Sequence, residues 1–274
     1  MPKIAIIIPV VNLWNTRTKK CIDSIKTSYE YRILCIDNAS VDETKVEAGK
    51  LVSDKFSHKR NEERWGCSQS WNYGINDAWD RGFDYVLVLN NDVILHPDCI
   101  DRMVERFEKS NSSGNITVEI YNNQHPLVMV TAMDIRGDCK TPENIFEKKS
   151  MDYDKLDESE HPNFSAFMIN KKCWQEVGEF DEGFFPSYFE DNDFHHRIKL
   201  SGMKAVTYPP ALFYHYGSST INQSDKEKVM GAVGFENTKK YFIEKWGGVP
   251  TEIKFGHPFN NPTYSLKYTK QKPQ

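Results

Sequence analysis

The chain has 274 residues, 39% of them hydrophobic, which is enough to bury the core of one large α/β domain or of two small ones. This composition excludes collagen, a coiled coil and wholesale disorder. The 35 Lys and Arg residues against 39 Asp and Glu give a net charge of −4, and no block of like charges is long enough to serve as a nucleic-acid arm. Nucleic acid is therefore not an expected partner.

Cysteine spacing and hydropathy indicate the compartment. The six cysteines are scattered, without a close pair and without a Cys/His cluster at zinc spacing, so we expect reduced thiols. The longest apolar run, Ile4 to Val11, is interrupted by Pro9, is too short to span a bilayer and lacks the basic front of a signal peptide. We expect a cytoplasmic protein without a transmembrane segment. Peripheral contact with the inner face of a membrane and the oligomeric state stay open.

The first half of the chain alternates strand and helix. Ile4 to Ile8 and Tyr85 to Leu89 are apolar runs without polar alternation, which favours strands buried on both faces of a parallel sheet. The elements expected in this half are strands at 4–8, 32–36 and 84–89 and helices at 16–29, 41–54 and 66–81. Residues 1–95 are therefore interpreted as a nucleotide-binding half, because open parallel sheets bind ligands beyond the carboxyl ends of their strands.

The second half is less regular. The elements expected here are strands at 127–133, 164–169, 205–208 and 211–214 and helices at 97–109, 187–200 and 225–246. The polar stretch 134–161 is expected to be a mobile loop. We interpret residues 1–220 as one α/β domain, with a smaller second part at 96–220, and residues 221–274 as a helix and an extended tail packed on the same domain.

A carboxylate stands directly after the buried strand that ends at Leu89, in the sequence Asn90, Asn91, Asp92. An acid in this position can hold a divalent cation through oxygen ligands, and the cation can neutralise a diphosphate. The alternative is an Asn/Asp turn that merely ends the strand.

Three carboxylates, Glu190, Asp191 and Asp193, mark the start of an expected helix, after Tyr188 and Phe189. Like charges and partial burial can raise a carboxylate pKa toward that of a general base, although a helix N-terminus opposes this shift. The alternative is ordinary helix chemistry, since acids favour helix N-termini and Asp193 can pair with Arg197.

The last signal is His215, which follows a strand among aromatic residues. A single histidine in such a place is more often a satisfied core residue than a ligand.

In chain order, these signals and four further segments resemble the family 2 glycosyltransferases with the GT-A fold, particularly their rhamnosyltransferase-like branch. Residues 6–12 look like the family's opening strand and the loop that cups the nucleotide, which places Pro9 and Val11 at the donor. Residues 35–42 are similar to the "vDNaSxD" segment, whose first Asp holds the nucleobase, here Asp37.

Two more segments match the donor side of the family. Residues 64–74 resemble "NxGfaxaxNxGi", in which Asn72 matches the second Asn, while Arg64, followed by Trp65, stands where the family usually has Asn. An Arg there can itself pair with a phosphate. Residues 89–93 look like the "LNNDv" version of the DxD motif, with Asp92 as the metal-binding member and Asn90 in place of the first carboxylate.

The catalytic side carries the most specific motif. Residues 173–193 are similar to the family's "vGgFDexFFxyxEDxDl" stretch, in which Asp191 occupies the place of the catalytic base. His215, Gly217 and Ser218 resemble "HxxgxS", whose His joins the metal or the diphosphate. Residues 241–247 look like the closing "YFxxKWG" helix.

The resemblance implies a GT-A fold, with a Rossmann-like, mostly parallel sheet flanked by helices and residues 96–220 as the acceptor and catalytic half. It also implies an inverting transfer of a sugar from a UDP- or dTDP-linked donor to a hydroxyl of a saccharide or a lipid-linked glycan. Mn²⁺ or Mg²⁺ at Asp92 and His215 would neutralise the diphosphate, and Asp191 would take the acceptor proton. The expected donor site is Pro9, Val11, Asp37, Arg64, Trp65, Asn72, Asn90, Asn91 and Asp92. The expected acceptor site is Trp71, Tyr188, Glu190, Asp193 and Arg197.

Other interpretations remain. A sugar nucleotidyltransferase would need a Gly-rich basic loop after the first strand, and residues 9–17 contain no glycine. A non-catalytic nucleotide- or sugar-binding module is disfavoured by the two acids and the histidine at their places. Residues 134–161 could act as a lid over the donor or be a solvated insertion. The aromatic residues Trp65, Trp71, Phe184, Phe185 and Tyr188 could form a sugar platform or fill the core.

Overall fold

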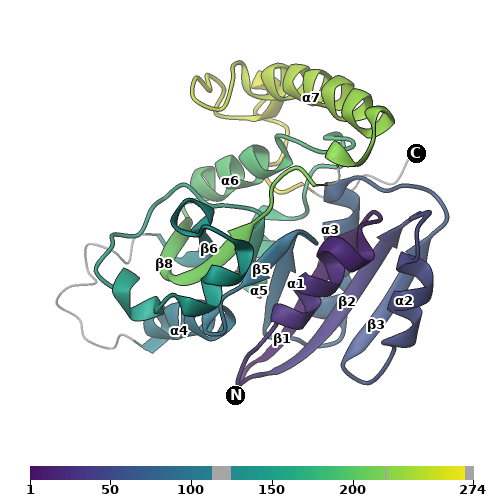
Figure 1. Ribbon diagram of the computed structural model, residues 1–274. Coiled ribbons are helices and arrows are strands. Elements are labelled where there is room, and N and C mark those ends of the chain that lie inside the picture. Colours follow the sequence, from purple (N-terminus) through teal and green to yellow (C-terminus); the bar gives the residue numbers. More distant parts are fainter. Residues whose placement is uncertain (113–124, 220, 269–274) are drawn as a thin grey trace.

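The core of the protein is one mixed β-sheet with helices on both faces (Figure 1). The structure, a computed structural model, describes residues 1–112, 125–219 and 221–268. In this part of the chain the sheet has eight strands in the order β3-β2-β1-β4-β7-β6-β8-β5. The strands are β1 (Lys3–Val10), β2 (Glu30–Asn38), β3 (Phe56–Asn61), β4 (Tyr85–Leu89), β5 (Val93–Leu95), β6 (Leu127–Asp134), β7 (Ala166–Asn170) and β8 (Lys204–His215).

The strand directions separate the two halves of the sheet. The four strands β3, β2, β1 and β4 pair in parallel, as the sequence predicts for a nucleotide-binding half. β7 is antiparallel to both β4 and β6, β6 and β8 are parallel, and β5 is antiparallel to β8. The expectation of an α/β sheet flanked by helices is confirmed, with antiparallel pairing confined to the second half.

Helices cover the two faces of the sheet in separate layers. They are α1 (Lys19–Ser24), α2 (Thr44–Lys50), α3 (Cys67–Asp80), α4 (Cys99–Ser112), α5 (Lys171–Val177), α6 (Glu190–Leu200) and α7 (Asp225–Trp246). α1, α2 and α4 contribute buried side chains to one apolar cluster, and α3, α5 and α6 to the other. β1 supplies Ile4, Ile6 and Ile8 to the first cluster and Ala5 and Ile7 to the second. Its apolar run therefore faces two layers, which explains the missing polar alternation.

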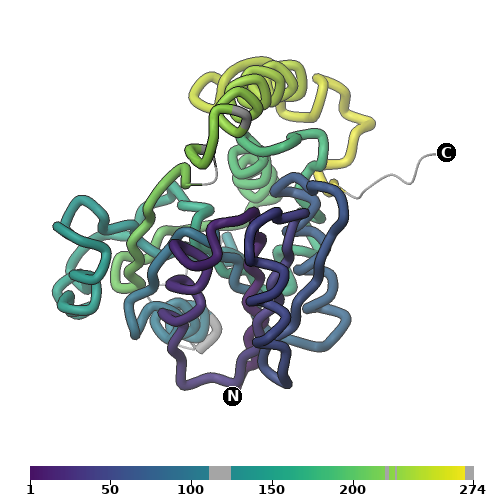
Figure 2. Tube along the Cα trace, turned by 45° about the vertical axis from the view of Figure 1, so that its right-hand side comes forward, coloured from purple at the N-terminus to yellow at the C-terminus, as the bar shows by residue number. Residues whose placement is uncertain are grey.

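α7 and the following segment lie over α6, away from Met1, in both views of the chain (Figures 1 and 2). A buried ion network ties the two helices together. Lys245 Nζ of α7 lies 2.6 Å from Asp181 Oδ2 and 2.6 Å from Asp193 Oδ1 of α6. Arg197 Nε donates to the other Asp193 oxygen at 2.9 Å, and Trp246 Nε1 donates to Asp193 Oδ1 at 2.9 Å. This network fixes the start of α6 against α7.

Several elements differ from the sequence expectation. β3 was not expected, because its sequence, Phe-Ser-His-Lys-Arg-Asn, is that of a polar edge strand, and the short elements β5 and α5 were not expected either. The helix expected at 16–29 is a π-helical turn (Trp14–Thr18) followed by α1. The strands expected at 205–208 and 211–214 form one strand, β8, whose register against β6 shifts where Pro209 and Pro210 separate them.

The stretch 134–161 is not a structureless loop. It contains three short 3₁₀ turns (Arg136–Asp138, Pro142–Glu147 and Ser150–Tyr153) and buries Ile145 completely in a small cluster with Ile94. His96 Nε2 lies 2.9 Å from the Lys148 carbonyl oxygen and pins the segment to the loop after β5. The sequence did not predict the burial of Ile145 or the contact of Lys148 with His96, because one buried isoleucine in a polar stretch produces no periodic pattern.

Across the described residues, no helix has both the length and the apolar character needed to cross a membrane.

Candidate active site

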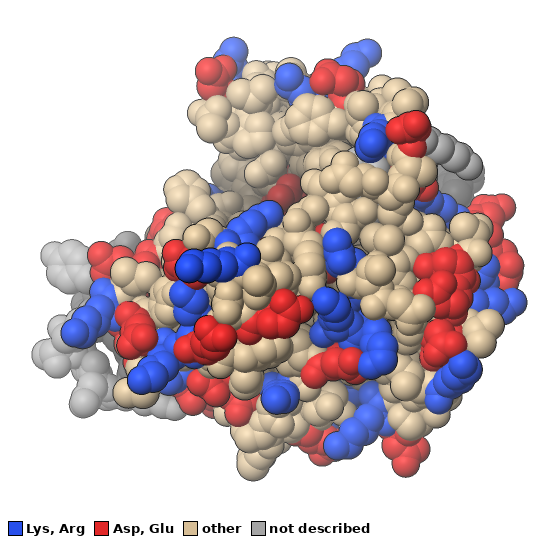
Figure 3. All heavy atoms as spheres, viewed as in Figure 1, with Lys and Arg blue, Asp and Glu red and all other residues tan. Residues whose placement is uncertain are grey.

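The main cavity has a volume of about 580 Å³ and lies at the carboxyl ends of the parallel strands. The ends of β1, β2 and β4 line it, together with the end of β8 and the first turns of α6 and α7. The surface is hollowed beneath α7, and Lys, Arg, Asp and Glu are interspersed over the face shown in Figure 3. This is the position in which open α/β sheets bind ligands.

Asp92 and His215 meet on one side of the cavity. Asp92 Oδ1 lies 3.1 Å from His215 Nε2, and Asp92 Oδ2 accepts a hydrogen bond from the Ser219 backbone N–H at 3.3 Å. On the other ring nitrogen, His215 Nδ1 lies 3.2 Å from Ser165 Oγ. Burial tends to raise the pKa of Asp92, but its hydrogen bond and charge interaction with His215, with help from Ser219, hold that pKa below its ordinary value. Asp92 is therefore an ionised carboxylate at neutral pH.

The chemistry of this pair fits a divalent cation. No group of three or more His, Cys, Asp and Glu side chains able to hold a metal exists among the described residues. Asp92 and His215 supply one carboxylate and one imidazole, and both side chains line the cavity. Mg²⁺ and Mn²⁺ commonly complete their coordination with water and substrate phosphate oxygens, so two protein ligands fit such a site.

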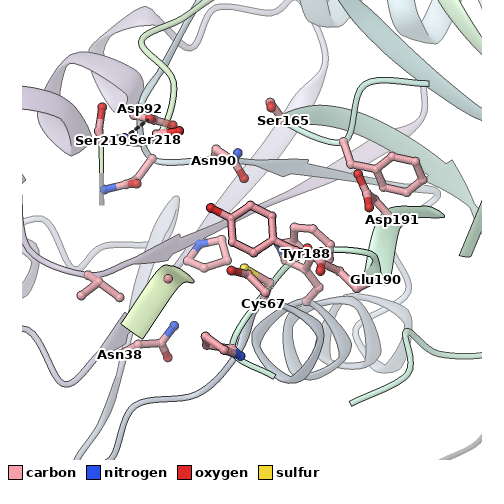
Figure 4. A pocket seen from close by; sticks show the side chains of 18 of the residues that line it. Asn38, Cys67, Asn90, Asp92, Ser165, Tyr188, Glu190, Asp191, Ser218 and Ser219 are labelled. Atoms are coloured by element: carbon pink, nitrogen blue, oxygen red, sulfur yellow. Dashed lines mark hydrogen bonds between the residues drawn. The ribbon is translucent and has the colours of Figure 1, made fainter. Parts of the chain in front are cut away.

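Glu190 and Asp191 occupy the other side of the cavity, across from Asp92 (Figure 4). The preceding residues Tyr188 and Phe189 have left-handed backbone conformations, with φ of 79° and 67°. Such conformations cost energy for bulky residues and concentrate at functional sites. They start α6 at Glu190 rather than at 187 as expected, so the two acids come from the first turn.

Both carboxyl groups are sheltered from water. Burial, and to a lesser degree the neighbouring Asp191, raise the pKa of Glu190 well above its ordinary value. Burial also raises the pKa of Asp191, whose Oδ1 accepts from the Asn192 backbone N–H at 2.8 Å. Glu190 Oε2 has no hydrogen-bond partner. A sheltered acid with a raised pKa is a candidate general base.

The expected aromatic residues divide between the cavity and the core. Tyr188 projects into the cavity between the Asp92 side and the Asp191 side (Figure 4), and Trp65 also lines it. Trp71 reaches the cavity wall but is only 3% exposed, and it packs edge-on against Phe167 and Phe180. Phe184 is fully buried in a separate cluster with α7.

Twelve expected residues line this cavity: Pro9, Val11, Arg64, Trp65, Trp71, Asn90, Asn91, Asp92, Tyr188, Glu190, Asp191 and His215.

Four expected residues lie outside the cavity. Asp37 is fully buried, and Arg60 Nη1 of β3 donates to its Oδ2 at 2.6 Å. Asn72 exchanges two hydrogen bonds with the backbone of Phe180, at 2.8 and 2.9 Å. Asp193 and Arg197 belong to the buried network below α7. These four side chains already have protein partners, and their assignment to the donor or acceptor site stays a prediction.

The structure also adds residues that sequence reasoning did not select. They include Asn38, Cys67, Ser165, Ser219, Glu227, Met230 and Gly231, all in the cavity wall. Ser219 could have been found as the neighbour of the segment 215–218. The first turn of α7 gave no such signal, because it lies between the matched segments at 215–218 and 241–247 and belongs to neither.

An open α/β sheet with a cavity at the carboxyl ends of its parallel strands is the arrangement in which many proteins bind nucleotides, and sequence comparison identifies the class. Residues 5–176 match the family description "Glycosyl transferase family 2". The match spans more than half of the chain, and the protein belongs to glycosyl transferase family 2. It is a glycosyltransferase.

Individual relatives are more distant. The chain is 27% identical over 152 residues to a "Galactofuranosyl glycosyltransferase" of Leishmania donovani; the alignment covers 55% of this chain and 32% of that protein. The chain thus spans about a third of that relative's length.

Solved structures share the fold at low identity. The mannosyltransferase PcManGT from Pyrobaculum calidifontis, in complex with GDP-Man and Mn²⁺, has a TM-score of 0.51 at 15% identity, over 78% of this chain and 56% of that one. S. aureus TarS 1-349 in complex with UDP has a TM-score of 0.55 at 13% identity, over 91% of this chain and 73% of that one. These similarities concern the fold.

Proposed function

We propose that this glycosyltransferase transfers a sugar, with inversion, from a UDP- or dTDP-linked donor to a hydroxyl of a saccharide or of a lipid-linked glycan. The observation that carries the proposal is the arrangement of Asp92 with His215 on one side of the cavity and of Asp191 on the other (Figure 4). The distant relative of Leishmania donovani, named a galactofuranosyl glycosyltransferase, supports a hexose as the sugar.

Donor binding is assigned to the side of the cavity formed by β1, β4 and the segment after β8. Asp92 and His215 would hold Mn²⁺ or Mg²⁺, which supplies charge neutralisation for the diphosphate leaving group. The complexes of PcManGT with GDP-Man and Mn²⁺ and of TarS with UDP support a nucleoside diphosphate as the ligand class. Asn90 and Asn91 offer uncharged amide groups beside it.

The chemical step is assigned to Asp191. Its carboxylate accepts the proton of the acceptor hydroxyl while the hydroxyl oxygen forms a bond to the anomeric carbon, and the bond from that carbon to the diphosphate oxygen breaks. Attack from the face opposite the leaving group inverts the anomeric centre and needs no covalent sugar–enzyme intermediate. Glu190 and Tyr188, beside Asp191, are assigned to the acceptor.

The test of the donor assignment is calorimetric titration with UDP, dTDP, GDP and CDP, each with and without Mn²⁺. Binding of UDP or dTDP that depends on the metal would support the proposal. Preference for GDP or CDP would replace the donor, and no binding of any of the four would favour a non-catalytic module on the same scaffold.

A further inference from the structure

Arg64 and Glu227 form an ion pair inside the wall of the cavity. Arg64 Nη1 donates to both carboxylate oxygens of Glu227, at 2.6 and 2.7 Å, although the residues are 163 positions apart. The two side chains are 27% and 14% exposed, and both line the cavity. The pair joins the loop between β3 and α3 to the first turn of α7.

The cavity wall holds more carboxyl groups than basic groups, and this makes the ion pair of Arg64 and Glu227 important for the binding of an anionic ligand. Among the described residues that line the cavity, Arg64 is the sole Lys or Arg, whereas Asp92, Glu190, Asp191 and Glu227 all carry carboxyl groups. Glu227 therefore neutralises the one permanent cation in the wall. A guanidinium binds carboxylate and phosphate through the same planar fork, so a diphosphate can compete with Glu227 for it.

We propose that Arg64 binds the diphosphate of the donor and that Glu227 is its counter-ion in the free protein, displaced when the donor binds. This inference rests on the proposed function, because it takes a nucleoside diphosphate as the ligand. Met230 and Gly231 of α7 line the same cavity one turn after Glu227. Exchange of the partner of Arg64 thus couples donor binding to the start of α7.

Two substitutions separate this role from a structural one. The Glu227 backbone N–H donates to Ser224 Oγ at 3.3 Å, and an acid in the first turn also stabilises a helix. Glu227→Gln keeps the shape and that backbone bond but removes the charge. Asp225→Asn removes the same charge from the same turn, where the fully exposed side chain lies 3.5 Å from Lys228 Nζ and is not among the residues that line the cavity.

The experiment is calorimetric titration of the full chain with UDP and dTDP, and with uridine and thymidine, which lack the phosphates, all in the presence of Mn²⁺. We expect Glu227→Gln to tighten binding of the preferred diphosphate by about three- to tenfold, the effect of a partly buried charge pair on a binding equilibrium. Nucleoside binding should not change, Asp225→Asn should behave like the parent, and the double variant Arg64→Gln/Glu227→Gln should lose the gain.

Each other outcome contradicts the proposal in its own way. Weaker or unchanged diphosphate binding by Glu227→Gln would make the pair a structural clamp. Equal tightening of the nucleosides, or an equal gain in Asp225→Asn, would remove the phosphate from the explanation. A parent protein that binds neither UDP nor dTDP would overturn the assigned donor itself, which the nucleotide series detects before any variant is measured.

Discussion

Glu190 and Asp191 are consecutive residues whose carboxyl groups line the same wall of the cavity, and burial raises the pKa of both. Two neighbouring acids in a sheltered site do not ionise independently, because the second negative charge meets the first. A proton kept by Glu190 would leave the neighbouring Asp191 as the carboxylate available to act as a base.

The pH dependence of stability follows from Glu190. Its folded-state pKa is raised above 4.5, so its protonated form is favoured by folding, and the stability it contributes is lost as pH rises through that raised pKa. Glu190→Gln, which cannot ionise, should melt several degrees higher than the parent at pH 8, and this difference should shrink as pH falls toward 4.5. Thermal unfolding between pH 4.5 and 8 measures it.

Glu236→Gln is the matched control, since it removes the same charge from an exposed position of α7. An advantage of Glu190→Gln that is constant over the whole pH range would mean that Glu190 is not the titrating group.

If Asp191 is the general base, the variant Asp191→Asn should lose turnover but keep its affinity for the nucleotide. Removing a general base lowers the turnover rate by about 10²- to 10⁴-fold. Because Asp191 lies across the cavity from Asp92, affinity for UDP or dTDP should stay within about twofold of the parent. Single-turnover transfer and nucleotide titration give the two numbers. Normal turnover in this variant would exclude Asp191 as the base, and a parallel loss of nucleotide affinity would indicate a disturbed fold.

Asp37 shows most clearly which parts of the candidate site could be predicted from the sequence and which could not. The motif around it predicts a nucleobase contact, which stays a prediction, and the structure adds a partner for its Oδ2, Arg60 of β3, a strand that the polar sequence did not predict. β1 and β4 are recognised in the sequence by apolar runs, because both of their faces are buried. An edge strand such as β3 lacks such a run, so Arg60 could not be predicted as the partner of Asp37. By contrast, Asp92 was selected because it stands directly after the strand that ends at Leu89, which is a local property of the sequence, whereas Asp191 and His215 were selected by their place in the segments that resemble the family.

The contact between Arg64 and Glu227 could not be read from the sequence at all. It depends on where α7 lies over the sheet, which a buried network around Lys245 fixes. Nothing in the spacing of charges along the chain specifies which of many acids meets which base across 163 residues. Long-range polar contacts of this kind need the fold.

The metal assignment predicts the behaviour of Asp92→Asn. This change keeps the size of the side chain but removes the sole carboxylate of the candidate metal pair. Affinity for UDP in the presence of Mn²⁺ should fall by at least about tenfold, as loss of interactions at metal sites commonly does. In EDTA the variant should bind UDP at least as tightly as the parent, because no metal then links the ligand to Asp92 and the variant lacks a negative charge that would repel the diphosphate. Parent binding that is the same with Mn²⁺ and with EDTA would contradict the assignment.

The buried network below α7 predicts a large loss of stability in Lys245→Met. The ammonium group lies between Asp181 and Asp193, each at 2.6 Å, and its side chain is 4% exposed. Removing one partner of a buried ion pair leaves uncompensated charge and costs about 3–5 kcal/mol. For a chain of this size the melting temperature should fall by about 10 °C.

Lys240→Met tests the same substitution on the surface of α7, where the side chain is 80% exposed and lies 3.9 Å from Glu244. Its melting temperature should stay within about 2 °C of the parent. Equal losses in the two lysine variants would show that the network adds nothing specific to the packing of α7.

The close approach of α3 to β1 gives a last prediction. A Cβ at Gly74 would lie 2.4 Å from Ile7 Cγ2, whereas a Cβ at Gly49 of α2 would meet nothing within 4 Å. Ile7 is 1% exposed and belongs to the buried apolar cluster that includes Trp71 and Ile75 of α3, so it has little space in which to move. Gly74→Ala should therefore destabilise the fold by about 1–3 kcal/mol through overpacking. Gly49→Ala should instead stabilise it by up to about 1 kcal/mol, because alanine loses less backbone entropy in a helix. Urea unfolding of both variants measures the change in the free energy of unfolding, which should be negative for Gly74→Ala and positive for Gly49→Ala. A stabilising Gly74→Ala would mean that α3 can move away from β1 at no cost.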